Sequence, residues 1–140
     1  MFHSVGYGLY NERNMADLVR CEIAVFMGKF PSYQISGTPI SSWIEYITGQ
    51  RGHQAILRYV RHIGNDNAWG GGLEMAVCSH MKNVNIHVYE SASPGAYRLI
   101  ARFDSPKQAQ RNINLLYVGR NHYDALVVRP HTLANRAPCA

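Results

Sequence analysis

The chain has 140 residues, of which 46% are hydrophobic, and a formal net charge of +5. This length fits one compact domain with a single core, and no apolar run approaches the roughly 20 residues that cross a bilayer. The first residues lack the basic segment and apolar core of a secretory signal, so neither a membrane nor a secreted protein is expected. The arginines are scattered along the chain, which argues against nucleic-acid binding despite the basic charge.

The cysteines and histidines show no pattern of a disulfide framework or a metal site. Cys21, Cys78 and Cys139 are odd in number and form no Cys-x-x-Cys pair, which fits a reducing compartment, the cytoplasm by default. No pair of histidines has acidic or cysteine neighbours at a recognised ligand spacing. We therefore expect no metal and no cofactor.

The first 30 residues predict two helices. Apolar side chains recur at helical spacing in residues 1–10, although nothing before Met1 can cap the first turn, so the chain is expected to start inside a helix. A core helix is expected over residues 15–29, ending before Pro31. The apolar positions that define these helices include Phe2, Val5, Leu9, Leu18, Cys21 and Val25.

Two more helices are predicted before residue 65. Thr38 can cap a helix and Pro39 suits its first position, and Gly49 is expected to end it. The next helix is expected to end at Gly64 and to lead through a polar loop to Trp69. The apolar stripe of the Thr38 helix, which we expect to face the core, consists of Ile40, Trp43, Ile44 and Ile47.

The second half of the chain predicts one helix followed by strands. An apolar helical stripe follows Trp69-Gly70-Gly71-Gly72 and closes at Asn83. Alternating or apolar segments then predict strands, with a turn over 91–95 and a polar connector over 104–112. The predicted strands are 84–89, 97–103, 113–118 and 122–128. This order predicts an α+β domain over residues 1–128, with N-terminal helices packed against a small, mainly antiparallel sheet, and a loosely held tail over 129–140.

The segment Asn121-His122-Tyr123-Asp124 carries a candidate catalytic pair. Side chains alternate faces along a strand, so His122 and Asp124 project from the same face. A carboxylate beside an imidazole fixes its tautomer and stabilises its charged form, as a histidine that activates a nucleophile requires. A polar pair at a strand end is the simpler alternative.

Several landmarks, in this order, resemble the ovarian-tumour (OTU) family of cysteine proteases, which remove ubiquitin from proteins. Trp69-Gly70-Gly71 followed by Gly72-Leu73-Glu74-Met75 is similar to the family's Trp-Gly-Gly-x-x-Glu-Leu segment. Residues 84–89 are similar to the strand behind its helix, and 113–117 followed by His122-Tyr123-Asp124 match its closing strands. Family members usually open with Asp-Gly-Asn/Asp-Cys before an apolar residue, Phe and a helix. Here Met1-Phe2-His3-Ser4-Val5 is expected to begin one residue after that cysteine.

The resemblance implies a papain-like domain that hydrolyses the isopeptide bond at the C-terminus of ubiquitin, or of a ubiquitin-like modifier, through a thiol acyl-enzyme. It implies that His122 and Asp124 are catalytic. The segment Trp69, Gly70 and Gly71 would contact the substrate. The alternative, to which we give equal weight, is that these residues only form a structural turn. Cys21 and Cys78 are poor replacements for the nucleophile, because both are expected on helices. If Met1 is the true start, the domain would be an inactive ubiquitin-binding module.

Overall fold

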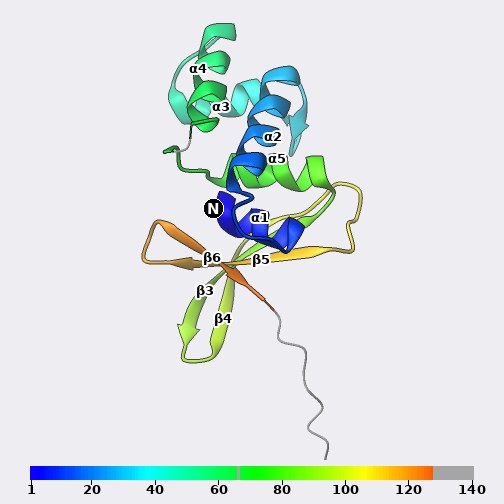
Figure 1. Ribbon diagram of the computed structural model, residues 1–140. Helices are drawn as coiled ribbons and strands as arrows, with labels where there is room; N and C mark the ends of the chain where they lie inside the picture. The colour runs from blue at the N-terminus through cyan, green and yellow to red at the C-terminus, as the bar shows by residue number, and fades with distance from the viewer. Residues whose placement is uncertain (66, 128–140) are drawn as a thin grey trace, which may run out of the picture.

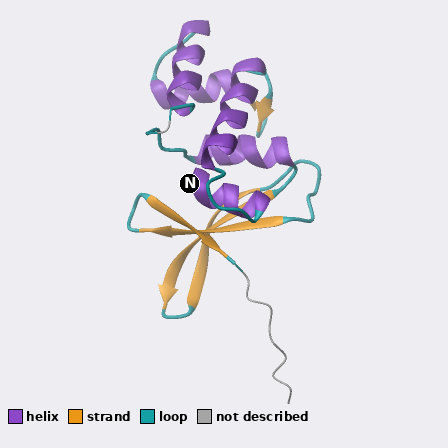
Figure 2. Cartoon of the chain, in the orientation of Figure 1, coloured by secondary structure: helices purple, strands orange, loops and turns teal. Residues whose placement is uncertain are grey.

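The computed structural model of the protein describes residues 1–65 and 67–127. Within these residues the helices come first and the main sheet follows (Figures 1 and 2). The helices are α1 (Phe2–Tyr10), α2 (Ala16–Lys29), α3 (Ile40–Thr48), α4 (His53–Ile63) and α5 (Gly72–Lys82). The strands are β1 (Gln34–Ile35), β2 (Thr38–Pro39), β3 (Asn85–Ser93), β4 (Ala96–Phe103), β5 (Asn112–Val118) and β6 (His122–Leu126).

The main sheet has the strand order β4-β3-β5-β6. The β3–β4 and β5–β6 pairs are antiparallel hairpins, whereas β3 and β5 pair in parallel. The sheet is therefore mainly antiparallel, as predicted. The parallel pair arises because β4 already returns the chain to the end of the sheet at which β3 begins, and residues 104–111 cross from β4 to the other side of β3, where β5 starts. Asn85 holds this connector in place, since its side chain donates to Ala109 O at 2.9 Å and accepts from Ser105 N at 3.0 Å.

The helices lie on one side of the sheet, where α5 packs against β3 and β4 and α1 lies directly against the closing strands (Figure 1). This helix packs against α2 on one side and against β5 and β6 on the other. At its far end, Arg111 donates to the carbonyl oxygens of Gly8 and Leu9, where a cation suits the helix dipole. The end of α1 is thus fixed relative to the start of β5.

The core face of α2 excludes three of the apolar positions by which the sequence defined this helix. Leu18 and Val25 are 44% and 46% exposed, and Cys21 is exposed as well. The helix is apolar on most sides, so residue spacing alone does not identify its inner face. Contacts with α1, α4 and α5 decide it. The buried apolar residues of α2 are Ala16, Val19, Ile23, Ala24 and Met27.

The predicted start of α3 is also wrong in detail. Pro39 is the residue that precedes the helix, no side chain caps it among the described residues, and Thr38 and Pro39 pair with β1 as a short hairpin. The end of α3 at Gly49 is confirmed, because this residue has a φ of 70°. Ile40 and Ile44 are buried as expected. Trp43 is half-buried and donates to Ile35 O at 3.0 Å, while Ile47 is exposed.

Strands β3, β4 and β5 start within one residue of the predicted positions, and the larger differences lie at two strand ends. The predicted turn over 91–95 is shorter, because β3 continues to Ser93 through irregular register with β4. The closing strand ends at Leu126, and the predicted end at Val128, the tail 129–140 and Cys139 lie outside the described residues. Within the part of the chain that the structure describes, no helix is both long and apolar enough to traverse a bilayer.

Candidate functional site

Three segments that are distant in sequence meet at the start of α1. The hydroxyl of Ser4 donates to the backbone oxygen of Tyr123 at 2.5 Å, which joins the first turn of α1 to β6. Gly70 packs against the same turn so closely that a Cβ atom there would lie 2.8 Å from the Phe2 ring and would clash with the Met1 side chain. The start of α1 therefore lies between the Trp69-Gly70-Gly71 segment and the closing strand (Figure 1).

The candidate catalytic pair lies on this closing strand. The structure brings His122 and Asp124 together on one side of β6, with a distance of 2.8 Å between His122 Nε2 and Asp124 Oδ1. Both side chains are exposed, at 63% and 56%. Because Nε2 faces the carboxylate, Nδ1 remains available to exchange a proton with another group. Tyr123, between them, provides the contact with α1.

The first turn of α1 offers backbone donors to a nearby anion. Met1 is the residue at its cap position, and no side chain among the described residues caps the helix. The first backbone N–H group with a partner inside the helix is that of Val5, which donates to Met1 O at 3.0 Å. The N–H groups before it lack a partner inside the helix, and the helix dipole makes this end favourable for negative charge.

Glu74 fixes the position of the glycine segment. This carboxylate is only 2% exposed, accepts from the Gly71 N–H at 2.7 Å and accepts from the Tyr59 hydroxyl at 2.6 Å. Burial, followed by the charge of Glu74, raises the pKa of Tyr59, so its hydroxyl remains a donor. In the sequence, Glu74 was noted only as a member of the segment from Trp69 to Met75 that resembles the OTU family. Its structural role depends on Tyr59, a partner 15 positions away that periodicity does not reveal.

Arg20 connects the same loop to α1. Its side chain is 6% exposed and donates to Ile63 O at 3.3 Å and to Ala68 O at 2.8 Å. The guanidinium carbon also lies 4.3 Å from the centre of the Phe2 ring, a cation–π contact. Arg20 therefore links the residues before Trp69 to the first turn of α1. Sequence reasoning missed this residue, although a charged side chain between the apolar positions of a core helix was a usable signal.

The family model described as OTU-like cysteine protease matches residues 2–124 of the chain. The chain belongs to the OTU family. The match begins in α1 and ends at Asp124, so it includes all three segments that meet at the start of α1.

One curated relative of this OTU chain is OVARIAN TUMOR DOMAIN-containing deubiquitinating enzyme 4 of Arabidopsis thaliana, which is 35% identical over 71 residues. The aligned part is 50% of this chain and only 22% of the relative. The solved OTUD1 OTU domain has a TM-score of 0.65 at 18% identity, over 91% of this chain and 77% of that one. The Hazara virus OTU bound to ubiquitin has a TM-score of 0.64 at 25% identity, over 92% and 74%. These matches confirm the predicted OTU-type fold.

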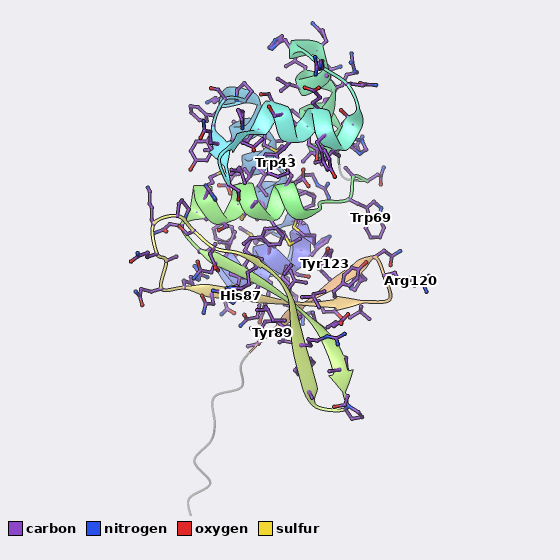
Figure 3. All side chains as sticks on the ribbon, turned by 180° about the vertical axis from the view of Figure 1, so that it is seen from behind. Trp43, Trp69, His87, Tyr89, Arg120 and Tyr123 are labelled. Atoms are coloured by element: carbon purple, nitrogen blue, oxygen red, sulfur yellow. The ribbon has the colours of Figure 1, made fainter. Side chains whose placement is uncertain are left out.

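Trp69 and its glycines have different environments in this OTU domain. The indole of Trp69 is 68% exposed and extends from the loop before α5 (Figure 3). It therefore contributes little to the core. Gly70, in contrast, fills a position where the backbone approaches Met1 and Phe2 too closely for a side chain. The close packing against α1 thus belongs to Gly70, no turn is formed by residues 69–71, and the aromatic ring remains accessible.

The described cysteines of this OTU chain are poorly placed to act with His122. Cys78 is fully buried on α5, and burial raises its thiol pKa to about 12. Such a thiol is almost entirely protonated near neutral pH. Cys21 is exposed on α2, which packs against α1, α4 and α5. Among the described residues, no group of three His, Cys, Asp or Glu side chains could hold a metal ion.

Proposed function

We propose that this chain forms the main part of a cysteine-type deubiquitinase domain. The observation that carries the proposal is the hydrogen bond from Ser4 to Tyr123, which sets the start of α1 beside the strand of His122 and Asp124. A helix N-terminus favours a thiolate, and a histidine oriented by a carboxylate can exchange its proton. Family membership supports the reaction class.

The proposed nucleophile is a cysteine immediately before Met1 in the natural polypeptide. Nδ1 of His122 would take the thiol proton while the sulfur attacks the carbonyl carbon at the C-terminal glycine of ubiquitin. N–H groups at the start of α1 would bind the resulting oxyanion. The imidazolium would then protonate the departing lysine amine as the C–N bond breaks. Water would hydrolyse the thioester, with His122 as base, and Asp124 would keep the imidazole oriented.

The Trp69-Gly70-Gly71 segment is the proposed wall for the extended tail of ubiquitin. Glycines allow another backbone to approach closely, and the exposed indole of Trp69 provides an apolar surface beside them. Two OTU domains similar to this chain, one from Hazara virus, have been solved with ubiquitin bound. A ubiquitin-like modifier with a similar extended tail would fit along the same wall.

A second candidate function is binding of ubiquitin without cleavage. It is supported by the cysteines of the described residues, because Cys78 is buried with a raised pKa and Cys21 lies on α2. In that case His122 and Asp124 would remain as a surface pair, and the same three segments would form the binding surface.

The test uses the protein with its natural upstream residues and ubiquitin that carries a C-terminal thiol-reactive group. The proposal predicts a covalent adduct that requires the upstream cysteine, and hydrolysis of ubiquitin amides that is lost in His122→Ala and reduced in Asp124→Asn. The control is Asp104→Asn. Asp104 also forms a hydrogen bond with a histidine, His87, so this variant makes the same chemical change elsewhere and should retain turnover. Ubiquitin binding without an adduct would support the second candidate. If the protein neither formed the adduct nor bound ubiquitin, both candidate functions would be contradicted.

A further inference from the structure

The loop between β5 and β6 contains a residue in an unfavourable backbone conformation. Val118 pairs with His122, so the loop comprises residues 119–121. Gly119 and Arg120 have φ angles of 61° and 75°, in the left-handed region. Glycine tolerates this region without cost, and asparagine or aspartate gain from local hydrogen bonds, but an arginine has neither advantage. The sequence thus retains a poorly suited residue two positions before His122.

No contact within the described structure accounts for this arginine. The hydroxyl of Tyr117 donates to the backbone oxygen of Arg120, a bond that any residue at this position could accept. The Arg120 side chain is exposed and forms no ion pair or hydrogen bond with other described residues. Glu90 lines the same surface depression, but its carboxylate is already paired with Arg98. The guanidinium therefore does not stabilise the fold through a partner of its own.

The position of Arg120 indicates a contact with a bound protein. Figure 3 shows it at the tip of the β5–β6 hairpin, on the same side of the molecule as Trp69. The hairpin and the Trp69 loop both adjoin the start of α1. A side chain at this tip can reach a protein that is docked across the site without contacting its own core.

We infer that Arg120 is a specificity-determining residue that binds a carboxylate on the protein docked at the site. The inference rests on the proposed function, because it assumes a ubiquitin-like partner between the Trp69 loop and the hairpin. A guanidinium matches a carboxylate through two parallel hydrogen bonds, which gives orientation as well as attraction. The backbone conformation then reflects a compromise in which recognition is retained at the expense of stability.

The test compares stability and ubiquitin affinity in the chain of residues 1–140. Arg120→Gly should raise the thermal midpoint by a few degrees, because glycine removes the steric conflict, and should weaken ubiquitin binding about five-fold at low salt. Arg120→Lys keeps the charge and should retain most of the affinity, whereas Arg120→Glu should bind more weakly than Arg120→Gly. The difference in ubiquitin affinity between the wild type and Arg120→Gly should shrink as salt is added.

Gln108→Gly is the matched control. Gln108 is another exposed residue with a long side chain and a φ of 55°, and it lies before β5, at the opposite end of that strand from Arg120. This variant should gain stability and keep its affinity for ubiquitin. Equal affinity of the wild type and Arg120→Gly, or a loss of stability in Arg120→Gly, would overturn the inference alone. Absence of ubiquitin binding by the wild type would overturn the proposed function and the inference with it.

Discussion

Tyr123 determines how the candidate catalytic pair is presented. Its backbone oxygen accepts the hydrogen bond from Ser4, and its ring packs against Tyr117 with 5.1 Å between the ring centres. Because neighbouring side chains on a strand point to opposite faces, His122 and Asp124 both project away from the side occupied by Tyr123. The orientation of the imidazole thus follows from backbone contacts of a residue that takes no part in proton transfer.

The two glycines after Trp69 should differ in their tolerance of substitution. Gly70→Ala would place a Cβ atom 2.8 Å from the Phe2 ring, so we expect a loss of about 1–3 kcal/mol in unfolding free energy and weaker ubiquitin binding. Gly71→Ala is the control, since its Cβ atom would meet nothing nearer than Glu74 Oε2 at 3.7 Å. Urea denaturation measures both. Equal effects of the two substitutions would contradict the close packing of Gly70 against α1.

Residue-level features were predictable from sequence where they depend on neighbours in the chain. His122 and Asp124 lie two positions apart, so strand alternation was sufficient to bring them together. The roles of Arg20 and Glu74 depend on Ala68 and Tyr59, at separations of 48 and 15 residues. Local periodicity contains no information about such partners, and only the packed structure reveals them.

At the scale of elements, Glu74 makes the start of α5 part of the site. Glu74→Met keeps a side chain of similar length but removes both carboxylate oxygens, so the Gly71 N–H and the Tyr59 hydroxyl both lose their acceptor. We expect a loss of about 1–3 kcal/mol in unfolding free energy. The loosened segment should also show as faster amide hydrogen exchange at residues 70–72.

Tyr59→Phe is the control for this prediction. It removes the bond to Glu74 Oε1 and leaves the bond from Gly71 intact. It should therefore lower stability by a smaller amount and leave the exchange rates of residues 70–72 nearly unchanged. If both variants altered exchange at these residues equally, Glu74 would not be the residue that holds the glycine segment.

Element prediction succeeded where one periodicity dominated and failed where two signals competed. The stripe of α3 and the alternation of β3 gave the correct element types. The inner face of α2 was not identified because the helix is apolar on most sides, and Leu18 and Val25, two of the positions that defined it, are exposed. The role of Thr38 was misassigned because pairing with β1 took precedence over capping. The parallel pairing of β3 and β5 depends on the path of the connector, which composition does not specify.

At the scale of the whole molecule, stability should fall at alkaline pH. Burial raises the pKa of Cys78 to about 12 and also raises that of Tyr59. Above about pH 9 the unfolded chain releases these protons while the folded chain keeps them, so unfolding becomes more favourable as pH rises. For one thiol the slope approaches about 1.4 kcal/mol per pH unit. Chemical denaturation at pH 8, 9 and 10 measures it.

Cys78→Ala should flatten this pH dependence between pH 9 and 10, even if its stability at neutral pH is lower. Cys21→Ala is the matched control, because it removes an exposed thiol, and the slope should remain that of the wild type. A slope unaffected by Cys78→Ala would show that the alkaline loss has another origin.

The basic charge of the molecule offers a separate check on the kind of partner. With a net charge of +5, binding to a nucleic acid would weaken steeply with salt, whereas recognition of a folded protein through a mixed surface should weaken less. We expect the salt dependence of ubiquitin binding to be modest and to be reduced further in Arg120→Gly.

The most direct test of the convergence of the three segments is chemical-shift mapping of the protein with unlabelled ubiquitin. We predict that the amide signals that change are those of residues 2–5, 69–72 and 117–124, which are separate in sequence and adjacent in the fold. Changes confined to α4 or to the tip of the β3–β4 hairpin, or no changes at all, would contradict the assignment of this site.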